Sequence, residues 1–484
     1  MNQKRVTKIS NWQIEEHVKK IQSGIITAEE TVYQCLSQIE SKQHLNAFLS
    51  VNEKTSLEQA KKIDQRVKKG VKVGKLAGTV FAVKDNINIE GHATTCASKI
   101  LENYISPYNA TVIDRLSAED AIILGKTNLD EFGMGSSTEN SCYAVCKNPF
   151  DEARVAGGSS GGSAVAVATG MAQASLGSDT GGSIRQPAAF CGLVGLKPSY
   201  GRVSRYGLVA YASSLDQIGP ICRTVADAAY ILQVIAGKDK KDTTCATVDV
   251  PNYKYFLNKS IEGLKIGIAD EYFGRGLQEE IKDRIMKVVD ELKAGGAKIE
   301  KITLPHVEYG IAAYYIIATA EASSNLARYD GIKYGFRDKN AKDLLDTYKF
   351  SRGLAFGEEV KRRIMLGTYV LSAGYYESYY KKAQQVRRLI KEDYDKVFSK
   401  IDCIISPTTP STAFLIGEKK EDPLAMYLSD IYTVTANLSG NCAINLPIGT
   451  DSSGLPIGMQ IMAAAFKEEN LFWLGNYIDR CYKT

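Results

Sequence analysis

The stretch from Gly157 to Ser183 combines hydroxyl side chains with a high density of glycine. Eight of its 27 residues are Gly and six are Ser, and no charged residue precedes Asp179. Glycine is costly to order, so such clusters indicate turns with positive φ or backbone that approaches another group closely. Serine hydroxyls beside exposed backbone N–H groups are the components of a nucleophile and an oxyanion hole. The stretch is therefore the candidate centre of an acyl-transfer site.

Two other interpretations of this stretch are weaker. Most Gly- and Ser-rich stretches are flexible linkers, but the apolar run Ala164–Ala168 and the nearby Met171 are unlike a linker. A membrane span needs about 18 predominantly apolar residues, and Gly and Ser interrupt this run repeatedly. A buried turn, helix and turn fits the stretch best.

A serine nucleophile needs a general base, and the chain offers few histidines. The four are His17, His44, His92 and His306. None lies in a Gly- and Ser-rich turn, although the sequence leaves open whether one approaches a serine in space. A buried lysine is the alternative, because burial can lower its pKa enough for it to accept a proton. Lys84 ends the apolar segment 78–83 and is the leading candidate, with Lys126 and Lys197 as rivals.

Composition limits the class of protein. The 484 residues are 44% hydrophobic and carry a net charge of +5, which is too mild to indicate a nucleic-acid binder. The ten cysteines form no CxxC motif, so we expect reduced thiols and no metal. The first 20 residues lack the apolar core of a secretory signal, which favours a cytoplasmic location. The run Gly125-Lys126-Thr127 resembles a phosphate-binding loop, but Asp120 stands where that motif needs glycine.

The apolar patterns predict one large α/β domain. Residues 1–70 form a predicted N-terminal helical layer of this domain, and residues 71–480 form its main body, with the Gly- and Ser-rich core at 157–220. A strand–helix–strand unit over residues 264–304 predicts a parallel or mixed sheet. The remaining expectations are helices at 27–40, 56–69 and 111–116, strands at 78–87, 121–124, 403–406 and 443–446, tight loops at 191–220, and mostly helix over 310–398.

Three motifs resemble the signature of the amidase signature family. They are GGSSGGS at 157–163, GSDTGGSIRQPA at 177–188 and GLKPSYGRVSRYGL at 195–208. The resemblance implies a single domain whose mixed sheet is covered by helices on both faces. It also implies Ser183 as the nucleophile, Ser159, with a cis peptide bond, as the bridging serine, and Lys84 as the base. The N–H groups of residues 180–183 would then hold the oxyanion; they belong to Thr180, Gly181, Gly182 and Ser183.

Within that family the chain is most similar to the glutaminase subunits of aspartyl/glutamyl-tRNA amidotransferases. The stretches that carry this similarity are 204–217, 359–368 and 426–431. The similarity implies that Arg363 and Tyr314 bind the carboxylate of glutamine and that Asp430 binds its α-amino group. Arg guanidinium matches a carboxylate bidentately. Arg362, the neighbouring residue, is the alternative for this contact.

The similarity implies a function for the chain within a larger assembly. Glutamine would be hydrolysed to glutamate and ammonia, and the ammonia would amidate Glu-tRNA(Gln), Asp-tRNA(Asn) or both. Two further polypeptides are implied, a kinase subunit that also binds tRNA and a small clamping subunit. No cofactor is expected in this chain, and ATP and Mg²⁺ would be used by a partner. The alternatives are a non-catalytic scaffold subunit, a stand-alone amidase and, weakened by Asp120, a nucleotide-binding protein.

Overall fold

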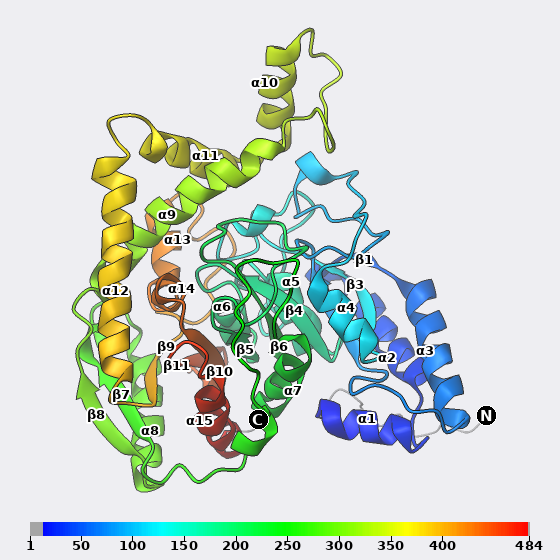
Figure 1. The fold of residues 1–484 in the computed structure, drawn as a ribbon, viewed down its shortest axis with the longest axis vertical. Coiled ribbons are helices and arrows are strands. Elements are labelled where there is room, and N and C mark those ends of the chain that lie inside the picture. The colour runs from blue at the N-terminus through cyan, green and yellow to red at the C-terminus, as the bar shows by residue number, and fades with distance from the viewer. Residues whose placement is uncertain (1–12, 483–484) are drawn as a thin grey trace.

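A mixed β-sheet of eleven strands runs through the computed structural model, which describes residues 13–482 (Figure 1). The strand order is β1-β3-β2-β4-β6-β5-β10-β11-β9-β7-β8. β2 pairs parallel with β3 and β4, β7 pairs parallel with β8 and β9, and the other pairings are antiparallel. The strands are β1 (Phe48–Val51), β2 (Val80–Lys84), β3 (Ile122–Thr127), β4 (Ala174–Asp179), β5 (Val194–Lys197), β6 (Gln217–Cys222), β7 (Lys265–Ala269), β8 (Lys298–Ile302), β9 (Cys403–Pro407), β10 (Cys442–Thr450) and β11 (Pro456–Ala463).

Helices cover both faces of this sheet. Cys403 and Ile405 of β9 join one hydrophobic core, formed with α1–α4, α7, α8 and α15, whereas Ile404 joins a second core formed with α9–α12 and α14. This alternation follows from the two-residue period of a strand. The helices are α1 (Ile14–Gln22), α2 (Ala28–Ser41), α3 (Glu53–Lys68), α4 (Thr111–Ala118), α5 (Gly161–Ala168), α6 (Arg185–Phe190), α7 (Val225–Ile235), α8 (Glu279–Ala294), α9 (Gly310–Asn325), α10 (Leu344–Ala355), α11 (Glu358–Leu371), α12 (Lys382–Phe398), α13 (Pro423–Tyr427), α14 (Val434–Ser439) and α15 (Glu468–Cys481).

The parallel pairing of β2 with β4 brings two chemically important chain segments together. Lys84 is the last residue of β2, and Asp179 is the last residue of β4, immediately before the second Gly-rich turn. Parallel neighbours end at the same edge of a sheet, where ligands bind in open α/β folds. The helix α5, which begins at Gly161, two residues after Ser159, packs against both β2 and β4. The sheet therefore assembles all three segments of the candidate site at one edge.

Several predicted elements are confirmed. The unit β7–α8–β8 is the expected strand, helix and strand, with the two strands parallel. The helix α2 begins with a complete capping box between Thr27 and Glu30. Residues 310–398 are mostly helical, as expected, and the fold is one α/β domain with a mixed sheet covered on both faces.

Other elements differ from those predicted from the sequence. The predicted helical layer contains a short strand, β1, and its first twelve residues lie outside the described residues. The stretch 157–183 contains β4 after its helix. The stretch 191–220, for which the sequence predicts loops, contains β5 and the first part of β6. All three of these strands are buried on both faces, so they lack the apolar–polar alternation that reveals a half-exposed strand.

Replacing Phe472 by alanine should destabilise the domain. Its ring is fully buried on α15 and packs edge-on against Tyr253, with ring centroids 4.9 Å apart. We expect the free energy of unfolding to fall by about 3–5 kcal/mol, measured by urea denaturation. The control is Leu389→Ala on α12, whose side chain is 40% exposed and whose loss should cost little. Equal effects of the two changes would contradict the assignment of Phe472 to the core.

Candidate active site

Lys84 and Ser159 contact each other directly in the interior. The Nζ of Lys84 donates to the Oγ of Ser159 at 2.7 Å and to the carbonyl oxygen of Ser178 at 3.2 Å. Both residues are almost completely buried, and the Gly158–Ser159 peptide bond is cis. Ser160 donates its N–H to the carbonyl oxygen of Ser183 at 3.2 Å, which joins the two Gly- and Ser-rich turns. The arrangement can pass a proton between an amine and a serine hydroxyl.

Burial prepares Lys84 to act as a base. Loss of hydration lowers its pKa to about 7, although the carboxylates of Asp130, Asp179 and Asp216 act in the opposite direction. The two rival lysines are placed differently. Lys126 forms a buried ion pair with Asp85 at 2.8 Å, and Lys197 donates to the carbonyl oxygen of Pro198 at 2.8 Å. Neither rival has a bond to a serine hydroxyl in the described part of the chain, so Lys84 is the lysine that is placed for proton transfer.

The turn that carries Ser183 is wound around the carboxylate of Asp179. This carboxylate accepts the N–H of Gly182 at 2.9 Å and the N–H of Ile184 at 3.2 Å, and it pairs with the buried guanidinium of Arg185 at 3.0 Å. Burial alone would raise the pKa of Asp179, but Arg185 outweighs this effect and brings the pKa down to about 2. The carboxylate therefore stays ionised and fixes the backbone of the turn, while the side chain of Ser183 remains 8% exposed.

The hydrogen bonds of the turn distinguish the N–H groups of the predicted oxyanion hole. The N–H of Gly182 donates to the carboxylate of Asp179. Among the described residues, no acceptor bonds the N–H groups of Gly181 and Ser183. A Cβ at Gly181 would lie 2.5 Å from the ring of Tyr314, so glycine is required for this approach. The turn thus carries the N–H groups of Gly181 and Ser183, and Tyr314 lies against it.

Arg363 lies in an aromatic pocket on the inner side of α11. Its side chain is only 3% exposed, and its guanidinium donates to Glu359 at 2.8 Å and to the hydroxyl of Tyr211 at 2.6 Å. The ring of Tyr315 lies 5.1 Å from its Cζ, and it packs edge-on against Tyr314. Arg362, by contrast, has a side chain that is 44% exposed. The structure therefore places Arg363, and not Arg362, beside Tyr314.

Asp430 completes this pocket with the opposite charge. It is buried, and its carboxylate accepts the hydroxyl of Ser136 at 2.5 Å. Burial raises the pKa of Asp430 to about 7, while Ser136 and the nearby Arg363 act to lower it. A buried guanidinium and a buried carboxyl group near one another are suited to the two charged ends of a free amino acid. The site therefore joins a serine hydroxyl to an ionic pocket.

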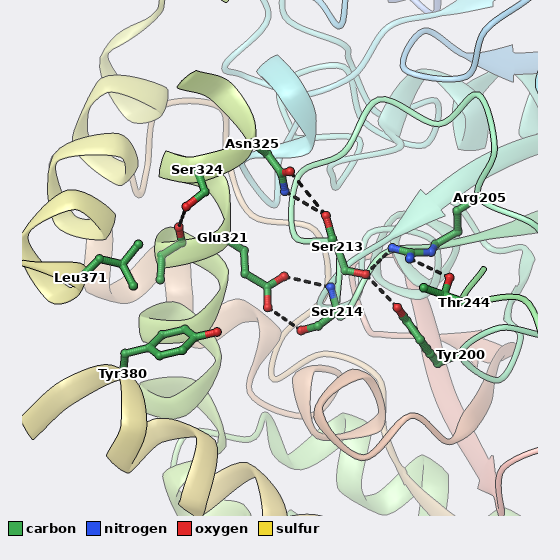
Figure 2. A pocket seen from close by; sticks show the side chains of 11 residues that line it. Tyr200, Arg205, Ser213, Ser214, Thr244, Glu321, Ser324, Asn325, Leu371 and Tyr380 are labelled. Atoms are coloured by element: carbon green, nitrogen blue, oxygen red, sulfur yellow. Dashed lines mark hydrogen bonds between the residues drawn. The ribbon is translucent and has the colours of Figure 1, made fainter. Parts of the chain in front are cut away.

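One loop, residues 211–216, contacts both parts of the site. Tyr211 binds Arg363, and the carboxylate of Asp216 accepts the hydroxyl of Thr180 in the nucleophile turn at 2.6 Å. Figure 2 shows how α9 supports this loop beside a cavity of about 480 Å³, with Glu321 accepting both the N–H and the hydroxyl of Ser214. Asn325 reaches Ser213 in the same view. The loop is thus held from α9 while it positions groups at the site.

The histidines take other positions. His17 is buried and faces the carbonyl oxygen of Gly78, and burial lowers its pKa to about 4. His44 and His306 pair with Glu152 and Asp393. Among the bonds of residues 13–482, none links a histidine to Ser159 or Ser183, so a histidine base, which the sequence left open, has no support in the fold.

The described residues contain neither a metal cluster nor a membrane-spanning helix. In residues 13–482, no group of three or more His, Cys, Asp or Glu side chains is arranged to hold a metal ion. No helix in the same range is long and apolar enough to cross a membrane.

Comparison with known proteins decides the family. The sequence profile of the Amidase family matches residues 30–472, which is most of the chain. The chain belongs to the amidase family. The match spans both Gly- and Ser-rich turns, β2 with Lys84, and the pocket around Arg363. The amidase fold thus accounts for the whole arrangement of sheet, turns and helices described above.

Named relatives of this amidase chain narrow the comparison. The A subunit of glutamyl-tRNA(Gln) amidotransferase from Caldanaerobacter subterraneus is 54% identical over 459 residues, covering 95% of this chain and 94% of the relative. The crystal structure of the protein of the same name from Thermotoga maritima is 42% identical with a TM-score of 0.80, covering 97% of this chain and 94% of that one. The peptide amidase of Stenotrophomonas maltophilia is 27% identical with a TM-score of 0.82, covering 98% and 97%. The amidase fold is shared with both kinds of protein.

Several side chains of this amidase site escaped the sequence analysis. They are Asp130, Glu131, Ser136, Asp179, Arg185, Tyr211, Asp216 and Glu359. Asp179 carried a signal, because it is the first charged residue of the Gly- and Ser-rich stretch, at the end of 22 uncharged residues. Most of the others take partners far away in the sequence, as Ser136 does with Asp430, and no local spacing reveals such pairs.

With Lys84 as the expected general base, the rate of amide hydrolysis should rise with pH through about 7, because the amine accepts a proton only after it has lost its own. With Asp430 as the expected partner of a substrate ammonium group, Asp430 must also be ionised in the free enzyme, and its pKa is about 7, so both groups would fail together in acid. We expect kcat/KM to fall below that pH more steeply than kcat, because a bound ammonium group keeps Asp430 ionised in the complex. Steady-state kinetics across the pH range measures this, and a kcat that is flat from one unit below to one unit above that pH would contradict the role of Lys84.

Proposed function

We propose that this protein is the glutaminase subunit of a tRNA-dependent amidotransferase. The observation that carries the proposal is the junction of two parts in one site: the Lys84–Ser159 contact beside the Ser183 turn, and the ionic pocket of Arg363 and Asp430. A general amide hydrolase has no need for two opposite buried charges next to its nucleophile. A free amino acid with an amide side chain needs both. The high identity to proteins named as the A subunit of glutamyl-tRNA(Gln) amidotransferase supports the same conclusion.

The proposed chemistry uses Lys84, Ser159 and Ser183 in a proton relay. Neutral Lys84 accepts the Ser159 proton while Ser159 accepts that of Ser183, and the Ser183 oxygen attacks the side-chain amide carbon of glutamine. The N–H groups of Gly181 and Ser183 stabilise the oxyanion that forms, with the N–H group of Thr180 as a third donor. The relay then returns the proton to the leaving nitrogen, ammonia departs, and a glutamyl ester remains on Ser183. Water hydrolyses that ester to glutamate and restores the serine.

The ionic pocket orients the glutamine for this attack. Arg363 and the hydroxyl of Tyr314 bind the α-carboxylate, and Asp430 binds the α-ammonium group. Glu359 accepts from Nε of Arg363 and Tyr211 accepts from Nη1, which leaves Nη2 without an acceptor among the described residues. Fixing both charged ends before reaction places the amide near the nucleophile and reduces the entropy lost in the transition state.

The ammonia would be used by the rest of the complex. In this proposal a partner activates Glu-tRNA(Gln), Asp-tRNA(Asn) or both with ATP and Mg²⁺ and transfers the ammonia, while a third, small polypeptide clamps the two larger ones. Such a complex works in the cytoplasm. Exposed apolar side chains on α10, which stands away from the body in Figure 1, support a role among other polypeptides; Leu344, Leu345 and Leu354 are 59–61% exposed.

Replacing Ser183 by alanine tests the nucleophile. We expect the purified complex to lose glutamine hydrolysis, measured as glutamate release, because no acyl ester can form. Amidation of misacylated tRNA with added ammonia should persist, since that step lies in the partner. Glutamate release that survives the change would overturn the assignment, and loss of the ammonia-dependent reaction as well would show that the fold or the assembly had failed.

Exchanging arginine for lysine at two adjacent positions tests the pocket. Arg363→Lys keeps the charge but loses the planar pair of donors, so we expect KM for glutamine to rise by about 10- to 100-fold. Arg362→Lys changes an exposed side chain on the same helix and should leave KM close to that of the unchanged protein. Glutamine kinetics of the two variants, measured side by side, decides the matter. An equal rise in both, or a rise only at Arg362, would place the carboxylate elsewhere.

A stand-alone amidase is the competing function, since the peptide amidase shares the fold. It predicts good hydrolysis of simple amides by the chain alone and no effect of partner subunits. The glutamine pocket predicts the reverse, so the assay of glutamate release with and without partners separates the two functions.

A further inference from the structure

Glu131 connects the catalytic turns to the helix that carries Arg363. It lies in the short helical turn Glu131–Gly133, just beyond β3, and only 2% of it is exposed. One carboxyl oxygen, Oε2, accepts the N–H of Gly357 at 2.8 Å across 226 residues of sequence. Gly357 is the N-cap of α11, whose second turn bears Arg363. The other oxygen, Oε1, accepts the hydroxyl of Ser98.

The contact between Glu131 and α11 is built for close approach. A Cβ at Gly357 would lie 2.4 Å from Oε2 of Glu131, so only glycine permits the bond as it stands. A carboxyl group is also favoured electrostatically at the N-terminus of a helix, where N–H groups lack intrahelical partners. The next residue, Phe132, packs edge-on against Phe356, which precedes Gly357, with ring centroids 5.8 Å apart. The start of α11 is therefore fixed against this turn by a hydrogen bond and by a ring contact.

Asp130, the residue before Glu131, contacts the part of the site that contains Ser159. Asp130 donates its N–H to the carbonyl oxygen of Ser159 at 3.2 Å. Its buried carboxylate accepts the N–H of Thr138 at 2.8 Å and that of Ser137 at 3.3 Å. Asp130 is thus bonded to Ser159, the proposed bridging serine, and the adjacent Glu131 is bonded to the start of α11, the helix that carries Arg363. Because consecutive Cα atoms are separated by a fixed distance, this pair limits how far the two can move apart.

We propose that Glu131 is a positioning residue that sets the place of Arg363 relative to the serine nucleophile, so that glutamine held by its carboxylate presents its amide to Ser183. This inference rests on the proposed glutaminase function. Glu131 itself touches neither substrate nor reacting atoms. It acts through the Gly357 N–H and the rigid first turns of α11, and a displacement of about 1 Å at such a point can cost 100-fold in rate.

The bond needs an oxygen acceptor and not a negative charge. Burial raises the pKa of Glu131 to about 7, yet a neutral carboxyl group still accepts the Gly357 N–H through its carbonyl oxygen. Glutamine at this position keeps that oxygen. Leucine has a similar volume and removes it. Comparing the two replacements therefore separates the hydrogen bond from the filling of space.

The test uses Glu131→Leu and Glu131→Gln in the assembled amidotransferase, with two readouts. The first is KM and kcat for glutamine. The second is the rate at which a small sulfonyl fluoride, which has no amino-acid carboxylate, modifies Ser183. We expect Glu131→Leu to lower kcat/KM for glutamine at least tenfold, with a fall in kcat and an unchanged labelling rate, and Glu131→Gln to recover most of this loss.

Two further variants make the result decisive. Gly357→Ala forces a Cβ against Glu131 from the other side and should lower kcat/KM in the same way, so it answers the question if Glu131→Leu fails to fold. Glu271→Leu is the control away from the site, because Glu271, although exposed, also accepts a distant backbone N–H, that of Leu304, at 2.9 Å, and the kinetics of this variant should not change.

The possible outcomes separate this inference from the function on which it rests. An unchanged kcat/KM for glutamine in Glu131→Leu or Gly357→Ala, or a parallel loss of glutamine hydrolysis and labelling, would overturn the positioning role. If the unchanged protein is labelled on Ser183 but does not hydrolyse glutamine, the proposed function fails, and with it the meaning of this contact.

Discussion

The site depends on the buried amine of Lys84, which no carboxylate of residues 13–482 contacts. The Nζ of Lys84 bonds to the hydroxyl of Ser159 and to a backbone carbonyl, and the loss of hydration brings its pKa to about 7. Lys126 is placed differently, because it forms a direct buried pair with Asp85. The amine of Lys84 can give up its proton near neutral pH because, among the described residues, no carboxylate in contact stabilises its charge.

Three nearby carboxylates would prevent this if they reached the amine, and the structure keeps them occupied. Each one instead accepts backbone N–H groups from a loop of the site. The pairs are Asp130 with residues 137–140, Asp179 with residues 182–184 and Asp216 with residues 211–212. The same bonds shape the loops that surround Ser159 and Ser183. The same hydrogen bonds therefore fix these carboxylates relative to Lys84 and fix the shape of the loops. A change to one of the carboxylates should alter both the pKa of Lys84 and the loop geometry.

The sequence predicted the parts of this site that depend on local chemistry. The Gly- and Ser-rich turns, the lysine at the end of an apolar strand and the β7–α8–β8 unit all follow from composition and period over a few residues. The strands β4, β5 and β6 escaped because both of their faces are buried. Tyr211 and Glu131 escaped because their partners lie 152 and 226 residues away. The hydrogen bond from the Gly182 N–H to Asp179 was not predicted for another reason. A spacing of three residues fits many turns, and only the fold selects this one.

The loop 211–216 is one of the links between the pocket of Arg363 and the turn that carries Ser183. Tyr211 fixes the guanidinium of Arg363, and Asp216 fixes the turn that carries the nucleophile. In the proposed function, the separation between the carboxylate anchor and the attacking hydroxyl is thus set by the backbone. Asparagine carries the same three functional groups as glutamine but is one methylene shorter. With its charged ends held in the same way, its amide would reach less far toward Ser183 than that of glutamine.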